Sequence, residues 1–134
     1  MPTRPPPAPT TMRLPFSPAS VSVARQRLRG WLVDHDVSEE HIEDARVVLS
    51  ELVANSVRHA TPLPDGSILV TWTLAEEGVR ISVTDGGGVS RPRALRASAS
   101  AVSGRGMAIV DVLTARWWSE QTGPRTTVHA LLPS

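Results

Sequence analysis

The sequence of 134 residues contains no cysteine, no tyrosine and no lysine, so all fourteen of its Lys and Arg positions are arginine. The absence of cysteine excludes disulfides, thiolate metal sites and a thiol nucleophile. The absence of lysine excludes Schiff-base chemistry and two nucleotide-binding scaffolds, the P-loop and the bilobal protein kinase, because both need a lysine at the phosphates. Without tyrosine, no phenol can act as an acid or accept a phosphate.

Long apolar runs are also missing, and none approaches the roughly 20 residues that a membrane-spanning helix needs. The segment PTRPPPAPTT after the first Met lacks the apolar stretch of a signal peptide. The net charge is +1 although the sequence pI is about 9.0, which is too near neutrality to indicate nucleic-acid binding. We therefore expect a cytoplasmic protein that binds neither membrane nor nucleic acid.

Proline is concentrated at the amino terminus, where seven of the first twenty residues are proline. Such a segment favours a solvated polyproline conformation, so residues 1–11 are predicted to be a disordered tail. The remaining residues, 12–134, are enough for one domain with one hydrophobic core.

The first half of the domain has the periodicity of helices. MRLPF (12–16) is a candidate edge strand, because Pro15 confines it to an edge. An amphipathic helix is predicted within residues 19–36, and a second helix from its N-cap Ser38 to about Ala60. The residues that form one continuous core-facing stripe on this second helix are Ile42, Ala45, Val48, Leu49, Leu52 and Ser56.

The second half alternates as strands do. Residues 67–75 and 79–85 predict a hairpin, followed by a long loop over 86–106. A short helix is predicted over 107–117, after which WWSEQ leads through a turn at 122–124 into a last strand, 125–133. Helices grouped against such strands predict an α+β protein, a two-layer α/β sandwich with a mostly antiparallel mixed sheet.

Three polar residues on the predicted second helix, Glu51, Asn55 and His59, recur at four-residue spacing and form one ridge. From Glu51 to His59 the ridge turns gradually around the helix towards the margin of the apolar stripe, where a cavity could lie. Glu51 has no cationic neighbour three or four residues away, so a carboxylate beside a buried face is available to water, a metal or a ligand. The ordinary alternative is a solvated Glu51 and a His59 that stabilises the helix terminus.

Two further features contain glycine. Asp85-Gly86-Gly87 puts a carboxylate at a strand end before backbone that can approach a ligand closely, and Ser103-Gly104-Arg105-Gly106 leads into the helix at Met107. Glycines at a helix N-terminus expose N–H groups to an anion. Taken singly, each could equally be an ordinary turn.

Together and in this order, these motifs resemble those of the GHKL (histidine kinase-like) ATPases. The matching features are E-x-x-x-N-x-x-x-H-A, a D-x-G that ends a strand, a long loop, a G-x-G that opens a helix, and Thr126-Thr127 on a closing strand. The superfamily includes histidine kinases, gyrase-type topoisomerases, the heat-shock chaperone of the ninety-kilodalton class and mismatch-repair ATPases. The resemblance covers about residues 12–132 and implies the Bergerat ATP-binding fold. In its compact size and in the residues of these motifs, the chain is most similar to stand-alone bacterial anti-sigma-factor serine kinases.

The resemblance implies roles for the helix residues. Asn55 would bind Mg²⁺ between the ATP phosphates, and an amide oxygen suits that ion. Glu51 would act as the catalytic base or orient the attacking group. Arg58 and His59 would make supporting contacts to the phosphates.

It also implies roles for the later motifs. Asp85 would accept a hydrogen bond from the adenine amino group, Gly87 would let the backbone approach the base, and Thr127 would bond the same carboxylate or the ring. Loop 88–103 would be the ATP lid. Two positions depart from the family pattern, Val89 where a glycine is usual and Met107 where a leucine is usual. The segment that would wrap the phosphates is Ser103, Gly104, Arg105, Gly106 and Met107.

The resemblance therefore implies an ATP-binding regulatory protein, a serine/threonine-protein kinase that acts as an anti-sigma factor by partner switching. Its expected cofactors are ATP and Mg²⁺, and its expected partners are a sigma factor and an antagonist protein. The alternative is an ATP-sensing module that sequesters a partner without phosphotransfer. A histidine-kinase fragment fits poorly, because residues 1–20 cannot supply a phosphoacceptor hairpin. The edge at 12–16 could pair with a second copy in a homodimer or be capped by another protein.

Overall fold

The computed structural model of the chain describes residues 8–88 and 104–133, with the side chains of residues 104–106 left out. Its helices and strands follow the predicted order along the chain. Their bounds are β1 (Thr10–Pro15), α1 (Ser20–Asp34), α2 (Glu39–His59), β2 (Ser67–Ala75), β3 (Gly78–Asp85), α4 (Gly104–Leu113), β4 (Arg116–Thr122) and β5 (Arg125–Pro133).

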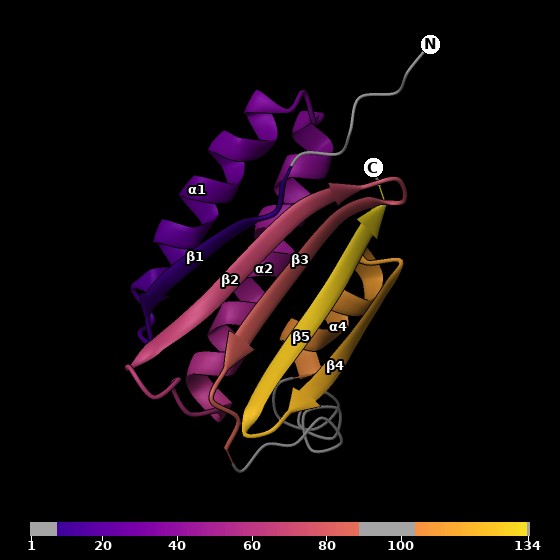
Figure 1. Cartoon of the computed structure of the whole chain (residues 1–134). Helices are drawn as coiled ribbons and strands as arrows, with labels where there is room; N and C mark the ends of the chain where they lie inside the picture. The colour runs from indigo at the N-terminus through magenta and orange to yellow at the C-terminus, as the bar shows by residue number, and fades with distance from the viewer. Residues whose placement is uncertain (1–7, 89–103, 134) are drawn as a thin grey trace.

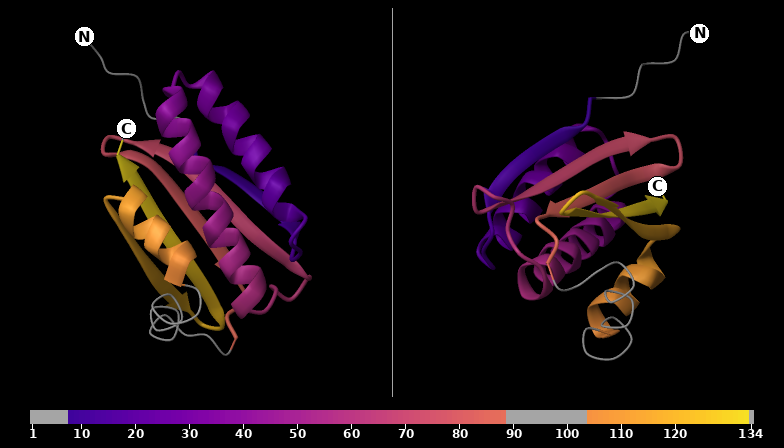
Figure 2. Two further views of the ribbon diagram at one scale, coloured as in Figure 1. Left: turned by 180° about the vertical axis from the view of Figure 1, so that it is seen from behind. Right: turned by 60° about the horizontal axis from the view of Figure 1, so that its bottom comes forward.

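The strands form one sheet of five in the order β1-β2-β3-β5-β4. All four pairings between neighbouring strands are antiparallel. Figures 1 and 2 show α1, α2 and α4 on the same face of this sheet. The arrangement confirms the predicted α+β two-layer sandwich, and none of the described strand pairs is parallel.

The core lies between the sheet and the helices. The predicted stripe on α2 is confirmed, since each of its six residues is at most 4% exposed. Alternate residues of the central strands meet it, among them Trp72 of β2 and Ile81 of β3. Because side chains of a strand alternate between faces, the residues between them point away from the helices.

The N-terminus of α2 is capped as predicted. The Ser38 hydroxyl accepts the backbone N–H of His41 at 3.4 Å, and Glu39 and Glu40 occupy the first turn. Arg58 and His59 lie in the last turn. This distribution of charge favours the helix dipole at both ends. No helix within the described ranges is long and apolar enough to cross a bilayer.

The first strand starts earlier than predicted. β1 begins at Thr10, two residues before the expected start at residue 12, so the end of the predicted tail is part of the sheet. Thr10 is paired with Trp72, and the hydroxyls of Thr11 and Thr71 are 3.1 Å apart. Residues 1–7 lie outside the described residues. Strand pairing extends over Thr10 and Thr11 because β2 is long enough to offer them partners.

The predicted helix over residues 107–117 is wrong at both ends. α4 begins at Gly104 and stops at Leu113, and Arg116 already belongs to β4. The chain leaves the helix because the Thr114 hydroxyl donates to the Val110 carbonyl at 2.7 Å and the Ala115 N–H donates to the Leu131 carbonyl at 2.8 Å. Pairing with β5 therefore overrides a periodicity that could continue as a helix.

Two glycines provide a test of this packing. A Cβ on Gly78, whose φ is +144°, would lie 1.8 Å from the Leu132 carbonyl oxygen, whereas a Cβ on Gly30, within α1, would have no heavy atom within 4 Å. We expect Gly78→Ala to lower the free energy of unfolding by about 1–3 kcal/mol. The matched Gly30→Ala should raise it by about 0.5–1 kcal/mol. Urea unfolding measures both, and equal effects would contradict the β3–β5 geometry.

Candidate functional site

A buried carboxylate lies at the last residue of β3. The Asp85 side chain is 3% exposed, its Oδ2 accepts the Ser56 hydroxyl at 2.6 Å, and its Oδ1 accepts the Gly87 N–H at 2.8 Å. Among the described residues no cation lies within 4.0 Å of it. Each carboxylate oxygen has two acceptor sites, so both oxygens can accept a further hydrogen bond.

The charge of Asp85 is unfavourable in this place. Burial raises the pKa of the Asp85 carboxyl, and the hydrogen bonds from Ser56 and Gly87 act against that rise without cancelling it. A buried carboxylate without a countercharge is destabilising unless donors surround it. A ligand that donates a hydrogen bond to Asp85 would therefore be bound favourably.

The glycines after Asp85 are needed for packing of the protein itself. The Thr61 N–H donates to the Gly87 carbonyl at 2.7 Å, and the Gly86 N–H donates to the Thr61 carbonyl at 2.9 Å. A Cβ on Gly86 would lie 2.0 Å from the Pro62 carbonyl oxygen, and one on Gly87 2.2 Å from that of Pro124. These contacts account for both glycines, while the close approach of a ligand to Gly87 stays a prediction.

The polar row on α2 lies at the margin of the core, as predicted. Asn55 is 9% exposed, and its Oδ1 is buried without a hydrogen-bond partner among the described residues. Glu51 and His59, one turn to either side, are partly buried. An unpaired buried amide oxygen costs free energy on its own, so this atom is suited to a cation or to a donor from a ligand.

These groups gather at one end of the molecule. Figure 1 shows the end of β3, the start of β5, the C-terminal end of α2 and the first turn of α4 together at the bottom of the view. The N-terminus of α4 at Gly104 therefore lies at the same end as Asp85. Because a helix N-terminus offers unpaired N–H groups, this end combines an anion-binding element with a buried acceptor.

Other predicted residues of the phosphate segment are placed differently. Met107 is 1% exposed and belongs to the core, so its side chain has no surface left for a ligand. Ser103 and the predicted lid lie outside the described residues, apart from Gly88, and so does the side chain of Arg105. Their contacts to phosphate stay predictions.

The predicted contact between Thr127 and Asp85 is wrong. Thr127 is paired with Thr84, and their hydroxyls are 2.8 Å apart on the face that points away from the helices. The residue opposite Asp85 is Thr126, which is 6% exposed. Because successive side chains of a strand point to opposite faces, a shift of one residue exchanges the two threonines.

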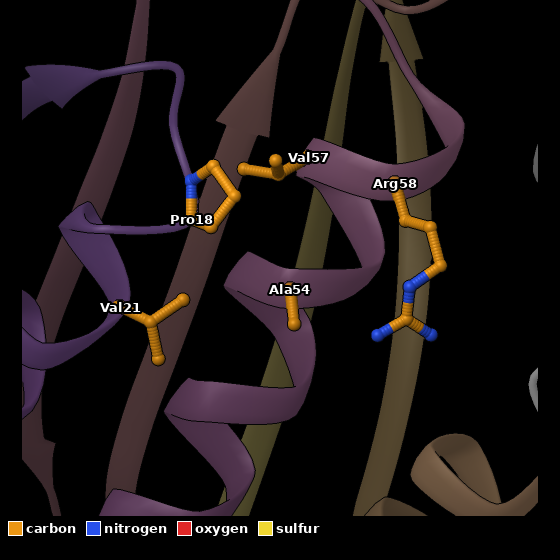
Figure 3. Close-up of a pocket in the computed structure, with 5 residues that line it drawn as sticks. All are labelled: Pro18, Val21, Ala54, Val57 and Arg58. Carbon is orange, nitrogen blue, oxygen red and sulfur yellow. The ribbon is translucent and has the colours of Figure 1, made fainter.

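Arg58 is in the last turn of α2, and Figure 3 shows its side chain on the side of that helix away from α1. It is exposed and lines a cavity of about 300 Å³ together with Pro18, Val21, Ala54 and Val57. Figure 3 shows Val57 pointing towards Pro18 while Arg58 extends the other way along the helix surface. The cavity is mostly apolar and distinct from the polar groups at Asp85 and Asn55. A role of Arg58 at the phosphates stays a prediction.

Sequence reasoning missed the role of Ser56. It was assigned to the apolar stripe of α2, where the structure confirms it, but its hydroxyl fixes the Asp85 carboxylate. A buried serine at the end of an otherwise apolar stripe needs a hydrogen-bond partner, and that was the available signal. The motif predicts Thr126 only as a residue of the closing strand, without a role at Asp85.

Comparison with known proteins identifies the family. Residues 14–131 match the family model described as a histidine kinase-like ATPase domain. The chain belongs to this family. The GHKL resemblance and the α+β fold expected from it are thereby confirmed.

Curated relatives of this histidine kinase-like ATPase domain are serine-protein kinases. The chain is 37% identical over 78 residues to serine-protein kinase RsbW of Listeria monocytogenes serotype 4a (strain HCC23), covering 58% of this chain and 50% of the relative. It is 33% identical over 78 residues to RsbW of Staphylococcus aureus (strain MRSA252), covering 57% and 49%. The chain thus spans about half the length of the curated relatives it matches.

Solved structures share the fold. The RsbU and RsbW domains of Rv1364c from Mycobacterium tuberculosis match with a TM-score of 0.71 and 26% identity, over 98% of this chain and 34% of that one. The SiaB–SiaC complex from Pseudomonas aeruginosa matches with a TM-score of 0.69 over 90% of this chain and 87% of that one. At 14% identity, the second likeness concerns the fold alone.

The raised pKa of Asp85 predicts how stability depends on pH. The folded protein binds this proton more tightly than the unfolded chain, so the contribution of Asp85 to stability falls as pH rises through the folded-state pKa. The contribution of Asp85 to stability does not change with pH below the unfolded-state pKa of about 3.9. We expect Asp85→Asn to gain stability relative to the natural chain as pH rises through this window. Denaturant unfolding at several pH values measures the difference, and a difference that does not change with pH would contradict the prediction.

The hydrogen bond from Ser56 can be tested separately. Ser56→Ala leaves a buried carboxylate oxygen without its donor and should cost about 1–3 kcal/mol at neutral pH. The control is Ser50→Ala on the same helix, because the Ser50 hydroxyl only bonds back to the Arg46 carbonyl at 2.7 Å. We expect the control to change the free energy of unfolding by less than about 0.5 kcal/mol. Equal losses in thermal or urea unfolding would contradict the special role of Ser56.

Proposed function

We propose that this chain is an ATP-dependent serine/threonine-protein kinase that acts in a partner-switching pathway. The observation that carries the proposal is that, within residues 8–88 and 104–133, the buried carboxylate of Asp85 has no countercharge and the buried amide oxygen of Asn55 has no hydrogen-bond partner, in a histidine kinase-like ATPase domain. One group suits a hydrogen-bond donor and the other a cation. Mg²⁺-ATP supplies both at the two ends of one molecule.

Asp85 is the proposed adenine-recognition residue. Its oxygens keep free acceptor sites after the bonds from Ser56 and Gly87, and the exocyclic amino group of adenine is a donor. Guanine has an acceptor oxygen at the corresponding position, which would face the carboxylate unfavourably. Thr126, opposite Asp85 in the sheet, is the hydroxyl placed to support this contact.

Asn55 and the N-terminus of α4 are proposed to hold the triphosphate end. Among the described residues no three His, Asp or Glu side chains cluster to hold a metal, so a cation here would have the Asn55 Oδ1 as a protein ligand together with phosphate oxygens and water. Mg²⁺ supplies neutralisation of the phosphate charge. The backbone N–H groups of Gly104–Gly106 would donate to the phosphates, with supporting contacts from Ser103, Arg105, Arg58 and His59.

Glu51 is proposed to assist the transfer. It lies one turn before Asn55 on α2 and is partly buried. In the reaction the acceptor hydroxyl oxygen forms a bond to the γ-phosphorus, the bond from that phosphorus to the bridging oxygen breaks, and ADP leaves with the electron pair. The hydroxyl proton moves to the Glu51 carboxylate or is held by it during the attack.

The proposed protein partners are a sigma factor and an antagonist that carries the acceptor serine or threonine. The support is the similarity to serine-protein kinases named RsbW. The outer edge of β1 is a place for further pairing, because β1 has a neighbour on one side only among the described strands. A homodimer through this edge is part of the proposal, and a different chain could pair there instead.

Substitution of Glu51 tests the catalytic assignment. Glu51→Gln keeps the size of the side chain but removes the base, so transfer of labelled phosphate from ATP to candidate antagonists should fall by about 10²–10⁴-fold. ATP affinity measured by calorimetry should change little. The matched control is Glu43→Gln on the same helix, since Glu43 only forms an exposed ion pair with Arg46 at 2.9 Å. The control should transfer phosphate as the natural chain does.

Two results would argue against the kinase proposal. Full transfer by Glu51→Gln would contradict the role of Glu51. Tight ATP binding by the natural chain without transfer to any antagonist would favour the ATP-sensing module that sequesters a partner.

A further inference from the structure

The face of the sheet opposite the helices, here called the open face, carries a second polar cluster. Figure 2 shows that α1, α2 and α4 leave this face uncovered. Strand register places Leu131 of β5 between Arg80 of β3 and Arg116 of β4. The next row on the same face is Ser82, His129 and Trp118. These residues lie on the other side of the sheet from Asp85.

A hollow of about 250 Å³ adjoins this cluster. Of the described residues, those that line it supply one cation and several hydroxyls and no carboxylate. A hollow with this composition favours an anionic ligand, because hydroxyls and a guanidinium are the donors that bind oxyanions. The lining residues are Pro9, Thr71, Thr73, Arg80 and Ser82.

The positive charge at the hollow is not neutralised within the described part of the chain. Neither Arg80 nor Arg116 has a carboxylate oxygen within 4.0 Å. Their guanidinium carbons lie 5.2 Å and 4.6 Å from the centre of the same Trp118 ring, so the ring orients both cations and keeps them close together. Glu120 of β4 lies 3.6 Å from His129 Nε2 through its Oε1. An anion beside Arg80 would relieve the repulsion between the two arginines.

Ser82 has a hydroxyl that can be directed at the hollow. Its Oγ is 2.6 Å from His129 Nδ1, while His129 Nε2 is buried without a hydrogen bond and lies 3.6 Å from Glu120 Oε1. When Nδ1 carries a proton and donates to Ser82, the Ser82 hydroxyl proton is free to donate to an anion. The polar groups that face His129 come from the two strands beside β5. They are Arg80 and Ser82 of β3 and Arg116, Trp118 and Glu120 of β4.

The pKa of His129 depends on the charge in the hollow. Burial and then the positive charge of Arg80 lower the pKa of His129, while Glu120 raises it. An anion bound at Arg80 would offset that repulsion and raise the pKa. It would also favour the imidazolium form, in which Nδ1 donates to Ser82 and Nε2 points to Glu120.

We propose that the hollow on the open face binds a compact phosphate oxyanion, with Arg80 as its charged ligand and Ser82 as a hydroxyl donor. The phosphate belongs either to free inorganic phosphate or to a small phosphate ester. A single guanidinium with neutral donors in a shallow hollow implies a Kd of about a millimolar. The site is independent of the proposed ATP site, because the sheet separates the two.

The experiment is a pH titration of the histidine ring signals of the full chain by NMR, with sodium phosphate added at constant ionic strength set by sodium chloride. We expect the apparent pKa of His129 to rise with phosphate and not with chloride. His59, on α2 at the other side of the sheet, shows whether phosphate binds there instead. A parallel titration with O-phosphoserine separates the sources, since tighter binding of the ester identifies an ester ligand and equal binding identifies free phosphate.

Two variants test the assignment of residues. Arg80→Gln should weaken phosphate binding by more than about tenfold, because it removes a charged hydrogen-bond donor. Arg116→Gln, which removes the same charge from the same Trp118 ring without lining the hollow, should weaken it by less than about threefold. Ser82→Ala should weaken binding because it removes the hydroxyl donor, while the phosphate that still binds beside Arg80 should continue to raise the pKa of His129. The proposal is overturned if phosphate moves His129 no more than chloride does, or if both arginine variants lose binding equally.

Discussion

The structure depends on one buried charge. Asp85 ends β3 inside the protein, and its two oxygens are tied to the hydroxyl of Ser56 on α2 and to the N–H of Gly87. The same segment is bonded to Thr61, directly after α2, so the end of the longest helix and the end of a central strand are fixed to each other through Asp85 and its glycines. The folded protein keeps a group whose charge is unfavourable there, which is typical of a site that serves a ligand.

The remaining arrangement follows from that junction. α2 buries an apolar stripe against the sheet, and Asn55 at its margin is buried with its Oδ1 unpaired among the described residues. The antiparallel order puts the start of β5 beside the end of β3, and α4 begins at the same end. The fold therefore brings a buried acceptor, an amide oxygen and a helix N-terminus together without a lysine, and the described residues contain no cluster of metal-ligating side chains. The opposite face of the sheet carries a separate group of arginines around Trp118.

Periodicity predicted the layers, because it reports which side of an element is buried. The stripe on α2, the cap at Ser38 and the order of helices and strands along the chain were predicted from the sequence pattern and were confirmed. Element ends were less predictable. The end of α4 at Leu113 depends on Ala115 bonding to Leu131, far along the chain, and the start of β1 depends on the length of β2.

Register between strands was the main gap at the site. Thr126 and Thr127 differ by one position, and only the pairing of Asp85 with Thr126 decides which side chain shares its face. Ser56 was hidden in the same way, since a helix stripe shows that it is buried but not that it meets Asp85. The chemistry of the motifs was readable from sequence, whereas the partners of each side chain needed the structure.

The central claim is that Asp85 recognises adenine in Mg²⁺-ATP, and titration calorimetry of the whole chain with Mg²⁺-ATP and Mg²⁺-GTP tests it most directly. The account predicts saturable binding of ATP and at least tenfold weaker binding of GTP, since the guanine oxygen would oppose the carboxylate. Equal binding of the two nucleotides, or no binding of ATP, would contradict it.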